Sequence, residues 1–175
     1  MYKKIKNFPN QISDGIKDVK NLSLDLDKVH RVVFMGMGGS AIAGSIMKDI
    51  CPHLELIVER NYFPSATIDE NTLLIICSYS GNTEETLSYY KHASSLTNNI
   101  FGITSGGKLL ELLKSENQNH CVLPGGYPPR SILGYVLTIL IGLLDEDGLL
   151  ELLNVELLLD YSDKFSLEDS EVFSL

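Results

Sequence analysis

Short, uniformly apolar runs recur along the chain and alternate with longer segments that have helical spacing. The apolar runs cover residues 31–36, 54–58, 73–77, 99–104 and 120–123. Because they lack the alternation of a half-exposed strand, they are typical of strands buried on both faces. Helices are predicted over 9–22, 40–50, 82–95 and 108–115, and a longer helix from near Pro129 to Leu144. This order predicts an α/β fold, a three-layer sandwich around a five-stranded parallel sheet with right-handed crossovers.

The C-terminal part of the chain departs from this pattern. The run 132–144 is apolar on nearly every face, yet it is shorter than the roughly 20 residues that span a bilayer. We expect a buried helix whose excess apolar surface packs against a missing domain or a second copy. A further helix is predicted over 149–159, and the polar stretch 162–175 is interpreted as a linker or a frayed end. The predicted organisation is one domain over 1–148, followed by a helix and linker over 149–175.

A hydroxyl-rich turn joins the third predicted strand to its helix. Ser78, Ser80 and Thr83 surround the start of that helix. A helix N-terminus has unpaired N–H groups and about half a positive charge, so this arrangement suits a phosphate group. The alternative is that Ser80 or Asn82 caps the helix, with Glu85 completing a capping box. Three hydroxyls and a glycine within six residues favour the phosphate site.

A glycine-rich turn follows the first predicted strand and has two interpretations. Gly36, Gly38 and Ala41 fit the dinucleotide-binding pattern G-x-G-x-x-G/A, with Glu59 in the place of a ribose-binding acid. In the other interpretation the turn is a second wall of the phosphate pocket, to which Ser40 contributes its hydroxyl and its N–H group. If the strand order is flavodoxin-like, 2-1-3-4-5, a crevice opens between strands one and three. Under that order both turns meet in one crevice.

Composition and charge exclude several classes of function. The net charge of −9 argues against nucleic acid as a partner, because phosphate backbones require a basic surface. Cys51, Cys77 and Cys121 are widely separated and are predicted to be buried thiols in a reducing compartment. No CxxC pair indicates a metal or redox site, and no cofactor is predicted. Since no apolar run follows the N-terminal residues, we predict a cytoplasmic protein with no membrane partner.

Four motifs, in order, resemble the first half of the bifunctional phosphoglucose/phosphomannose isomerases of the sugar isomerase (SIS) superfamily. They are GMGGSAI at 36–42, SYSGNTEET at 78–86, ITSGGKL at 103–109 and PRSILGY at 129–135. The resemblance covers roughly residues 5–145 and implies an SIS fold. It implies that the phosphate is held by Ser40, Ser78, Ser80 and Thr83, with Gly38 and Gly39 shaping the turn.

The resemblance also implies a catalytic role for Arg130. Aldose–ketose isomerisation moves a proton between C1 and C2 through an enediolate, and a fixed cation opposes the developing negative charge. Arg130 would face the sugar and supply that cation. The alternative is a guanidinium in a surface loop that pairs with a carboxylate.

The catalytic acid and base of the family have no counterpart here. The resemblance places the proton-shuttling Glu and the ring-opening His of these enzymes in a second SIS domain. No family motif of this chain contains His30, His53, His92 or His120. We therefore expect half of an isomerase, whose linker leads toward a second SIS domain or whose active form is a homodimer.

The predicted function is a phosphosugar isomerase domain that binds hexose 6-phosphate. The reaction would convert glucose 6-phosphate or mannose 6-phosphate to fructose 6-phosphate. Three alternatives remain open: a complete single-domain isomerase of the 6-phospho-3-hexuloisomerase type, a non-catalytic phosphosugar-binding module, and a dinucleotide-dependent dehydrogenase.

Overall fold

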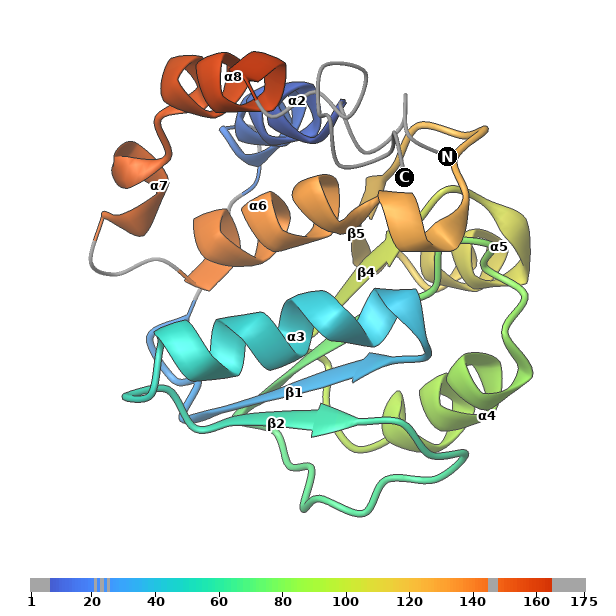
Figure 1. The fold of residues 1–175 in the computed structure, drawn as a ribbon. Helices are drawn as coiled ribbons and strands as arrows, with labels where there is room; N and C mark the ends of the chain where they lie inside the picture. The colour runs from blue at the N-terminus through green and yellow to red at the C-terminus, as the bar shows by residue number, and fades with distance from the viewer. Residues whose placement is uncertain (1–6, 21, 23, 25, 145–147, 165–175) are drawn as a thin grey trace, which may run out of the picture.

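A parallel sheet forms the centre of the molecule (Figure 1). The computed structural model describes residues 7–20, 22, 24, 26–144 and 148–164. The strands are β1 (Arg31–Gly36), β2 (Leu56–Glu59), β3 (Thr72–Cys77), β4 (Ile100–Thr104) and β5 (Asn119–Val122). Five strands pair in parallel in the order β2-β1-β3-β4-β5. The predicted fold class and strand order are confirmed, and no strand boundary moves by more than two residues.

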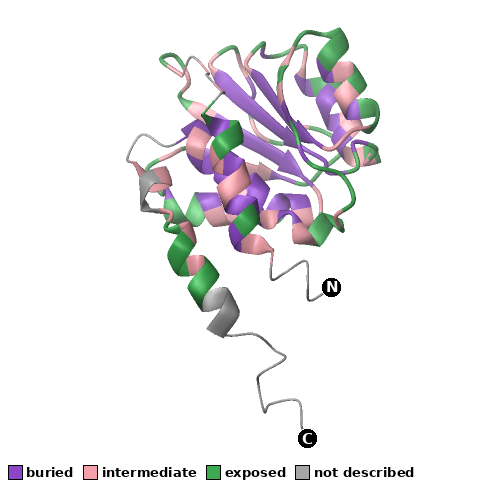
Figure 2. Ribbon diagram, turned by 90° about the horizontal axis from the view of Figure 1, so that it is seen from above, coloured by how far each residue is buried: buried purple, intermediate pink, exposed green. Residues whose placement is uncertain are grey.

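Helices cover both faces of the sheet. The helices α3 (Gly39–Ile50) and α6 (Leu133–Leu144) cover one face, and α4 (Glu84–Ala93) and α5 (Gly107–Ser115) cover the other (Figure 1). Phe34 and Ile75 belong to the core beneath α3 and α6. Their neighbours Met35 and Ile76 belong to a second core beneath α4 and α5. Every residue of β3 is buried, as expected for a strand covered on both sides (Figure 2).

An additional helix, α2 (Phe8–Val19), covers the outer side of α6 (Figure 1). Glycines bring the two helices close together: a Cβ atom on Gly142 would overlap Val19, and one on Gly15 would lie 2.9 Å from Thr138. As a result, nine residues of α6 are buried. The prediction that the run 132–144 needs a missing domain or a second copy to bury it is therefore wrong, because α2 provides the cover.

The C-terminal part contains two helices where the sequence predicts one over 149–159. They are α7 (Leu149–Leu152) and α8 (Val155–Lys164). The side-chain oxygen of Asn154 accepts a hydrogen bond of 2.9 Å from the N–H group of Leu157, so it caps a new helix and ends the first. α8 packs against α2 and includes 162–164, which the sequence assigns to the linker. The remainder of that predicted linker, 165–175, lies outside the described residues.

The described helices also bear on the membrane question. None of them is both long enough and apolar enough to cross a bilayer.

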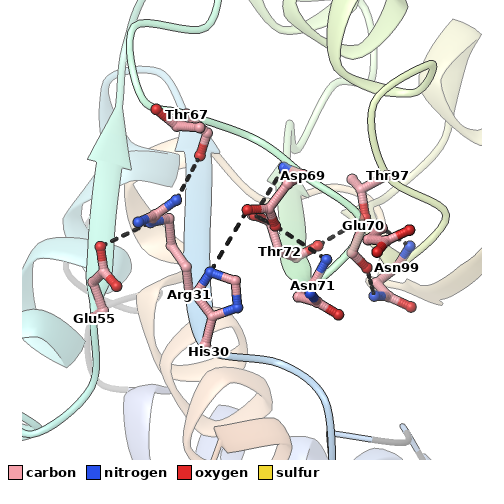
Figure 3. A network of polar contacts seen from close by, with 10 residues as sticks. All are labelled: His30, Arg31, Glu55, Thr67, Asp69, Glu70, Asn71, Thr72, Thr97 and Asn99. Atoms are coloured by element: carbon pink, nitrogen blue, oxygen red, sulfur yellow. Dashed lines mark hydrogen bonds and ion pairs between the residues drawn. The ribbon is translucent and has the colours of Figure 1, made fainter.

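A network of polar contacts joins the strands at the amino edge of the sheet (Figure 3). Arg31 of β1 donates to Glu55 across 2.8 Å and to the carbonyl oxygen of Thr67 across 3.1 Å. The carboxylate of Asp69 accepts from the hydroxyl of Thr72 at 2.8 Å. These contacts fix the segment that leads into β3, and so help to set where β3 begins beside β1.

Stability at low pH is expected to depend on Asp69. The hydroxyl of Thr72 donates to its carboxylate and holds the pKa of Asp69 below the usual value of 3.8, and the N–H group of Asn71 acts in the same direction. Because the folded protein favours the charged form, this stabilisation is complete above the unfolded-state pKa and is lost as the pH falls through the folded-state pKa. Asp69→Asn should therefore make acid unfolding less steep between about pH 5 and pH 2, measured by circular dichroism.

Asp49→Asn provides the matched control for this measurement, because Asp49 is exposed on α3. It should leave the acid transition unchanged. If Asp69→Asn behaves like this control, the carboxylate of Asp69 does not contribute to stability in the folded protein.

Candidate functional site

The turns that follow β1 and β3 begin side by side at the carboxyl edge of the sheet. The two strands pair in register with Gly36 opposite Cys77. α3 begins at Gly39, directly after the first turn, and α4 begins at Glu84, after the second. Two helix N-termini therefore flank the ends of neighbouring strands. At α3, however, the N–H groups of Ser40 and Ala41 already donate to the carbonyl oxygens of Met37 at 3.0 Å and Gly38 at 3.2 Å, so the predicted Ser40 N–H group is occupied. We call these turns, residues 36–40 and 78–83, the β1–β3 site.

Three of the residues predicted to bind phosphate come together in the β1–β3 site. The hydroxyl oxygens of Ser78 and Thr83 lie 2.9 Å apart. Ser40, in the first turn of α3, lies close enough to Cys77, the residue next to Ser78, for its hydroxyl to lower the pKa of that thiol. Ser40 and Ser78 are 5% and 2% exposed, so packing fixes the positions of their hydroxyls.

The cysteine beneath these hydroxyls is inert. Burial raises the pKa of Cys77 to about 12, and the hydroxyl of Ser40 only partly opposes this shift. The thiol is therefore neutral at physiological pH and is no candidate nucleophile. Cys51 and Cys121 are buried as well and form no disulfide, which confirms the predicted buried thiols.

The remaining predicted phosphate ligands lie around this group. Ser80 is exposed, and its hydroxyl oxygen accepts a hydrogen bond of 3.2 Å from the N–H group of Asn82. Gly38 precedes α3 with a φ of +51°, a conformation that glycine adopts far more readily than other residues. Gly39 begins the helix itself. The structure thus separates the contacting pair, Ser78 and Thr83, from Ser80 on the surface of the same turn.

The capping interpretation of the hydroxyl-rich turn is wrong. Thr83, and not Ser80 or Asn82, occupies the cap position of α4, and no side chain there forms a capping hydrogen bond. Asn82 instead links the turn to α5: its side-chain oxygen accepts from the N–H group of Lys108 at 3.1 Å, and its amide donates to the carbonyl of Ser80 at 3.2 Å. The first turn of α4 is therefore not closed by a side-chain cap.

A third loop supports the hydroxyl-rich turn from behind. The hydroxyl of Ser105 donates to the carbonyl oxygen of Tyr79 at 2.6 Å, and the N–H group of Leu109 donates to that of Gly81 at 2.9 Å. A Cβ atom on Gly81 would overlap the carbonyl oxygen of Gly106. The Ser-Gly-Gly turn after β4 is the sequence signal for this loop, but its role becomes visible only in the fold.

Arg130 lies beside the N-terminus of α3. It belongs to a short 3-10 helix, η1 (Pro129–Ser131), and is exposed. A Cβ atom placed on Gly39 would lie 3.0 Å from the carbonyl oxygen of Pro129 and 3.2 Å from the Cα atom of Arg130. The backbone that carries the guanidinium thus packs against the start of α3. Among the described residues Arg130 has no carboxylate partner, so the alternative of a surface ion pair receives no support there.

Glu59 does not have the free carboxylate that a ribose ligand would require. Its side chain is 2% exposed. One carboxylate oxygen accepts from the hydroxyl of Ser65 at 2.7 Å and from the N–H group of Ala66 at 2.7 Å, and the other accepts from Asn61 at 3.3 Å. Glu59 therefore holds the loop between β2 and β3, which argues against the dinucleotide-binding interpretation of the glycine-rich turn.

The histidines lie away from the β1–β3 site. His30 and His53 precede β1 and β2 at the amino edge of the sheet, His92 is in the last turn of α4, and His120 is in β5. Within the described ranges, no group of three or more His, Cys, Asp and Glu side chains could hold a metal ion. The part of the chain that the structure describes thus offers hydroxyls, N–H groups and an arginine at this site, but no histidine base.

A large open groove lies elsewhere on the described part of the molecule. It has a volume of about 830 Å³ and runs between α4 and α5. Lys91, Lys108, Glu84 and Glu111 line it, so charges of both signs face this space. It shares Asn82 with the β1–β3 site.

Comparison with known proteins identifies relatives over most of the chain, although no family model matches it. A bifunctional phosphoglucose/phosphomannose isomerase from Caldicellulosiruptor bescii is 39% identical over 157 residues, 86% of this chain and 46% of the relative. One from Aquifex aeolicus is 35% identical over 151 residues, 84% and 46% of the two chains. A D-glucosamine-6-phosphate 4-epimerase from Sulfolobus acidocaldarius is 37% identical over 150 residues, 83% and 45% of the two. The chain spans about half the length of the curated relatives it matches.

Solved structures share the fold at low sequence identity. A tagatose-6-phosphate ketose/aldose isomerase from Escherichia coli matches with a TM-score of 0.67 and 19% identity over 93% of this chain and 50% of that one. A Methanococcus jannaschii protein, for which a 3-hexulose-6-phosphate isomerase function is inferred, matches with a TM-score of 0.53 and 19% identity over 93% and 89%. The five-stranded parallel sheet of this chain is thus a fold that it shares with the tagatose-6-phosphate ketose/aldose isomerase.

Gly81→Ala is expected to disrupt the hydroxyl-rich turn. Gly81 has a φ of +66°, and the added methyl group would overlap the carbonyl oxygen of Gly106. A left-handed conformation alone costs a non-glycine residue about 1–2 kcal/mol, and the overlap adds to this. Gly126→Ala is the matched control, because Gly126 also has a positive φ but a Cβ atom there meets nothing within 4 Å. Urea denaturation should give a clearly larger loss for Gly81→Ala, and equal losses would contradict the backbone contact.

Proposed function

This chain is a homologue of the bifunctional phosphoglucose/phosphomannose isomerases over about half of their length, and we propose that it is the phosphosugar-binding half of an aldose–ketose isomerase. The substrate class is hexose 6-phosphate, interconverting glucose 6-phosphate or mannose 6-phosphate with fructose 6-phosphate. The observation that carries the proposal is the meeting of Ser40, Ser78 and Thr83 between two helix N-termini.

Phosphate binding follows from the chemistry of these groups. A phosphate dianion needs several donors, and hydroxyls together with the N–H groups at two helix starts provide them without a lysine. In the proposed complex Ser40, Ser78 and Thr83 donate from within the β1–β3 site, and Ser80 donates from its surface. Gly38 and Gly39 shape the turn: Gly38 leaves room for the phosphate to approach the backbone, and Gly39 leaves room for the backbone of η1. The local donors act at short range, so the net charge of −9 does not prevent binding.

Arg130 is proposed to stabilise the enediolate. As a proton leaves one of the two carbons C1 and C2, negative charge develops on the neighbouring oxygen, and a fixed cation lowers the energy of that state more than that of the substrate. Support comes from the packing of its backbone against Gly39 at the start of α3. The guanidinium would then reach the sugar of a substrate whose phosphate lies in the β1–β3 site.

The acid and base of the reaction are proposed to come from outside this chain's site. The family resemblance assigns them to a second SIS domain, and the histidines here lie away from the β1–β3 site. We therefore propose that residues 1–148 form the phosphosugar domain, and that 149–175 leads toward a second SIS domain, or that a homodimer supplies the missing groups. A cytoplasmic location belongs to the same proposal.

Ligand binding tests the phosphate site. Fructose 6-phosphate should raise the Tm and bind with measurable heat in calorimetry, whereas fructose should not. Thr83→Val should weaken binding of fructose 6-phosphate by about 10- to 100-fold, because a hydrogen bond to a charged group contributes about 1.5–3 kcal/mol. Ser115→Ala removes a hydroxyl at the end of α5 and should bind as the wild type does. Equal binding of the sugar with and without its phosphate would contradict the proposal.

Turnover separates the half-enzyme from a complete enzyme. We expect this chain alone to convert glucose 6-phosphate to fructose 6-phosphate at a rate close to that of Arg130→Ala, in a coupled assay. Robust turnover would contradict the half-enzyme version. It would instead favour the single-domain 6-phospho-3-hexuloisomerase type, whose support is the match over 89% of the M. jannaschii chain.

A further inference from the structure

The backbone around Arg130 is held by two side chains that lie far from it in the sequence. η1 has only three residues and does not form an extended helix that could fix its own position. We infer that Gln11 and Tyr79 are positioning residues, which hold the backbone on either side of Arg130 so that its guanidinium stays aligned with the β1–β3 site. This inference rests on the proposed function of Arg130.

Gln11 holds the segment that follows Arg130. Its side chain comes from α2 and is fully buried, at 0% exposure. The amide donates to the carbonyl oxygen of Ser131 at 2.5 Å, and the side-chain oxygen accepts from the N–H group of Gly134 at 3.2 Å. One side chain thus pairs a carbonyl of η1 with an N–H group of the first turn of α6. Such groups at helix ends lack partners within the helix, so they depend on a contact of this kind.

Tyr79 holds the segment that precedes Arg130. Its hydroxyl donates to the carbonyl oxygen of Pro124 at 2.9 Å and accepts from the N–H group of Tyr127 at 2.8 Å. Tyr79 lies between Ser78 and Ser80, in the hydroxyl-rich turn itself. The loop before Arg130 is therefore tied directly to the turn proposed to hold the phosphate.

The two contacts together fix the backbone from which the exposed side chain of Arg130 extends. Arg130 packs its backbone against Gly39, while Gln11 and Tyr79 hold the chain after and before it. An exposed arginine has many rotamers, but the point from which it extends is fixed relative to both helix N-termini. Fixing that point lowers the entropy lost when the guanidinium engages a ligand. Gln11 accordingly acts on the sugar through Arg130 and leaves the phosphate contacts alone.

A double-mutant cycle with two ligands tests this inference. Gln11→Met keeps the length of the side chain and removes both polar atoms. In the full chain we expect it to weaken binding of fructose 6-phosphate by about tenfold in calorimetry, and to leave the affinity for inorganic phosphate within about twofold. In the Arg130→Ala background, Gln11→Met should cause no further loss for fructose 6-phosphate. A residue that only stabilised the fold would weaken both ligands alike or neither.

Val19→Ala is the matched control, because Val19 lies at the other end of the α2–α6 contact, against Gly142. It should lower stability and leave both affinities unchanged. If Gln11→Met does not fold, Tyr79→Phe enters the same cycle with the same expected outcome. A loss that persists in the Arg130→Ala background, or wild-type affinity in the folded variant, overturns the inference. If the wild type binds neither fructose 6-phosphate nor phosphate, the proposed function itself fails.

Discussion

The parallel pairing of β1 with β3 is the constraint on which the candidate site depends. With Gly36 opposite Cys77, the turns after both strands start at the same level, and α3 and α4 begin beside each other. Moving one strand by a single residue would send its side chains to the other face of the sheet. Phe34 would then leave the core beneath α3 and α6, and Ser40 would lose its contact with Cys77. The same register therefore maintains both the cores and the site.

Much of the fold could be predicted because its information is local. The run 73–77 is apolar without alternation, and it proves to be the strand buried on both faces. The helix break at Asn154 is not predicted, since its side-chain cap competes with a leucine pattern that continues past it. The run 132–144 reveals that a surface is apolar, but it cannot reveal that α2 covers that surface. The close approach at Gly142 is a property of the packed helices alone.

In the candidate site, too, local sequence patterns predict some residues and tertiary contacts determine the others. Ser78 and Thr83 are five residues apart, and the turn that contains them indicates their meeting. Ser40 could be placed beside Ser78 and Thr83 only by assuming a strand order. The structure confirms that order. Gln11 could not be found, because 120 residues separate it from the carbonyl that it holds. Asn82 resembles a helix cap in the sequence, and its link to Lys108 depends on how two loops pack. Sequence patterns thus indicate which residues carry the chemistry, whereas the residues that position them come from tertiary contacts.

The position of α2 on α6 has a consequence for how the protein is made on the ribosome. α2 is among the first parts of the described chain to be synthesised, yet its main packing partner is complete only at Leu144. During translation, the five strands can pair before α2 has anywhere to dock. Contacts of such long sequence separation form late and slow folding, because a large loop must close first. Until Leu144 has been synthesised, the side of α2 that packs on α6 therefore has no complete partner to cover it.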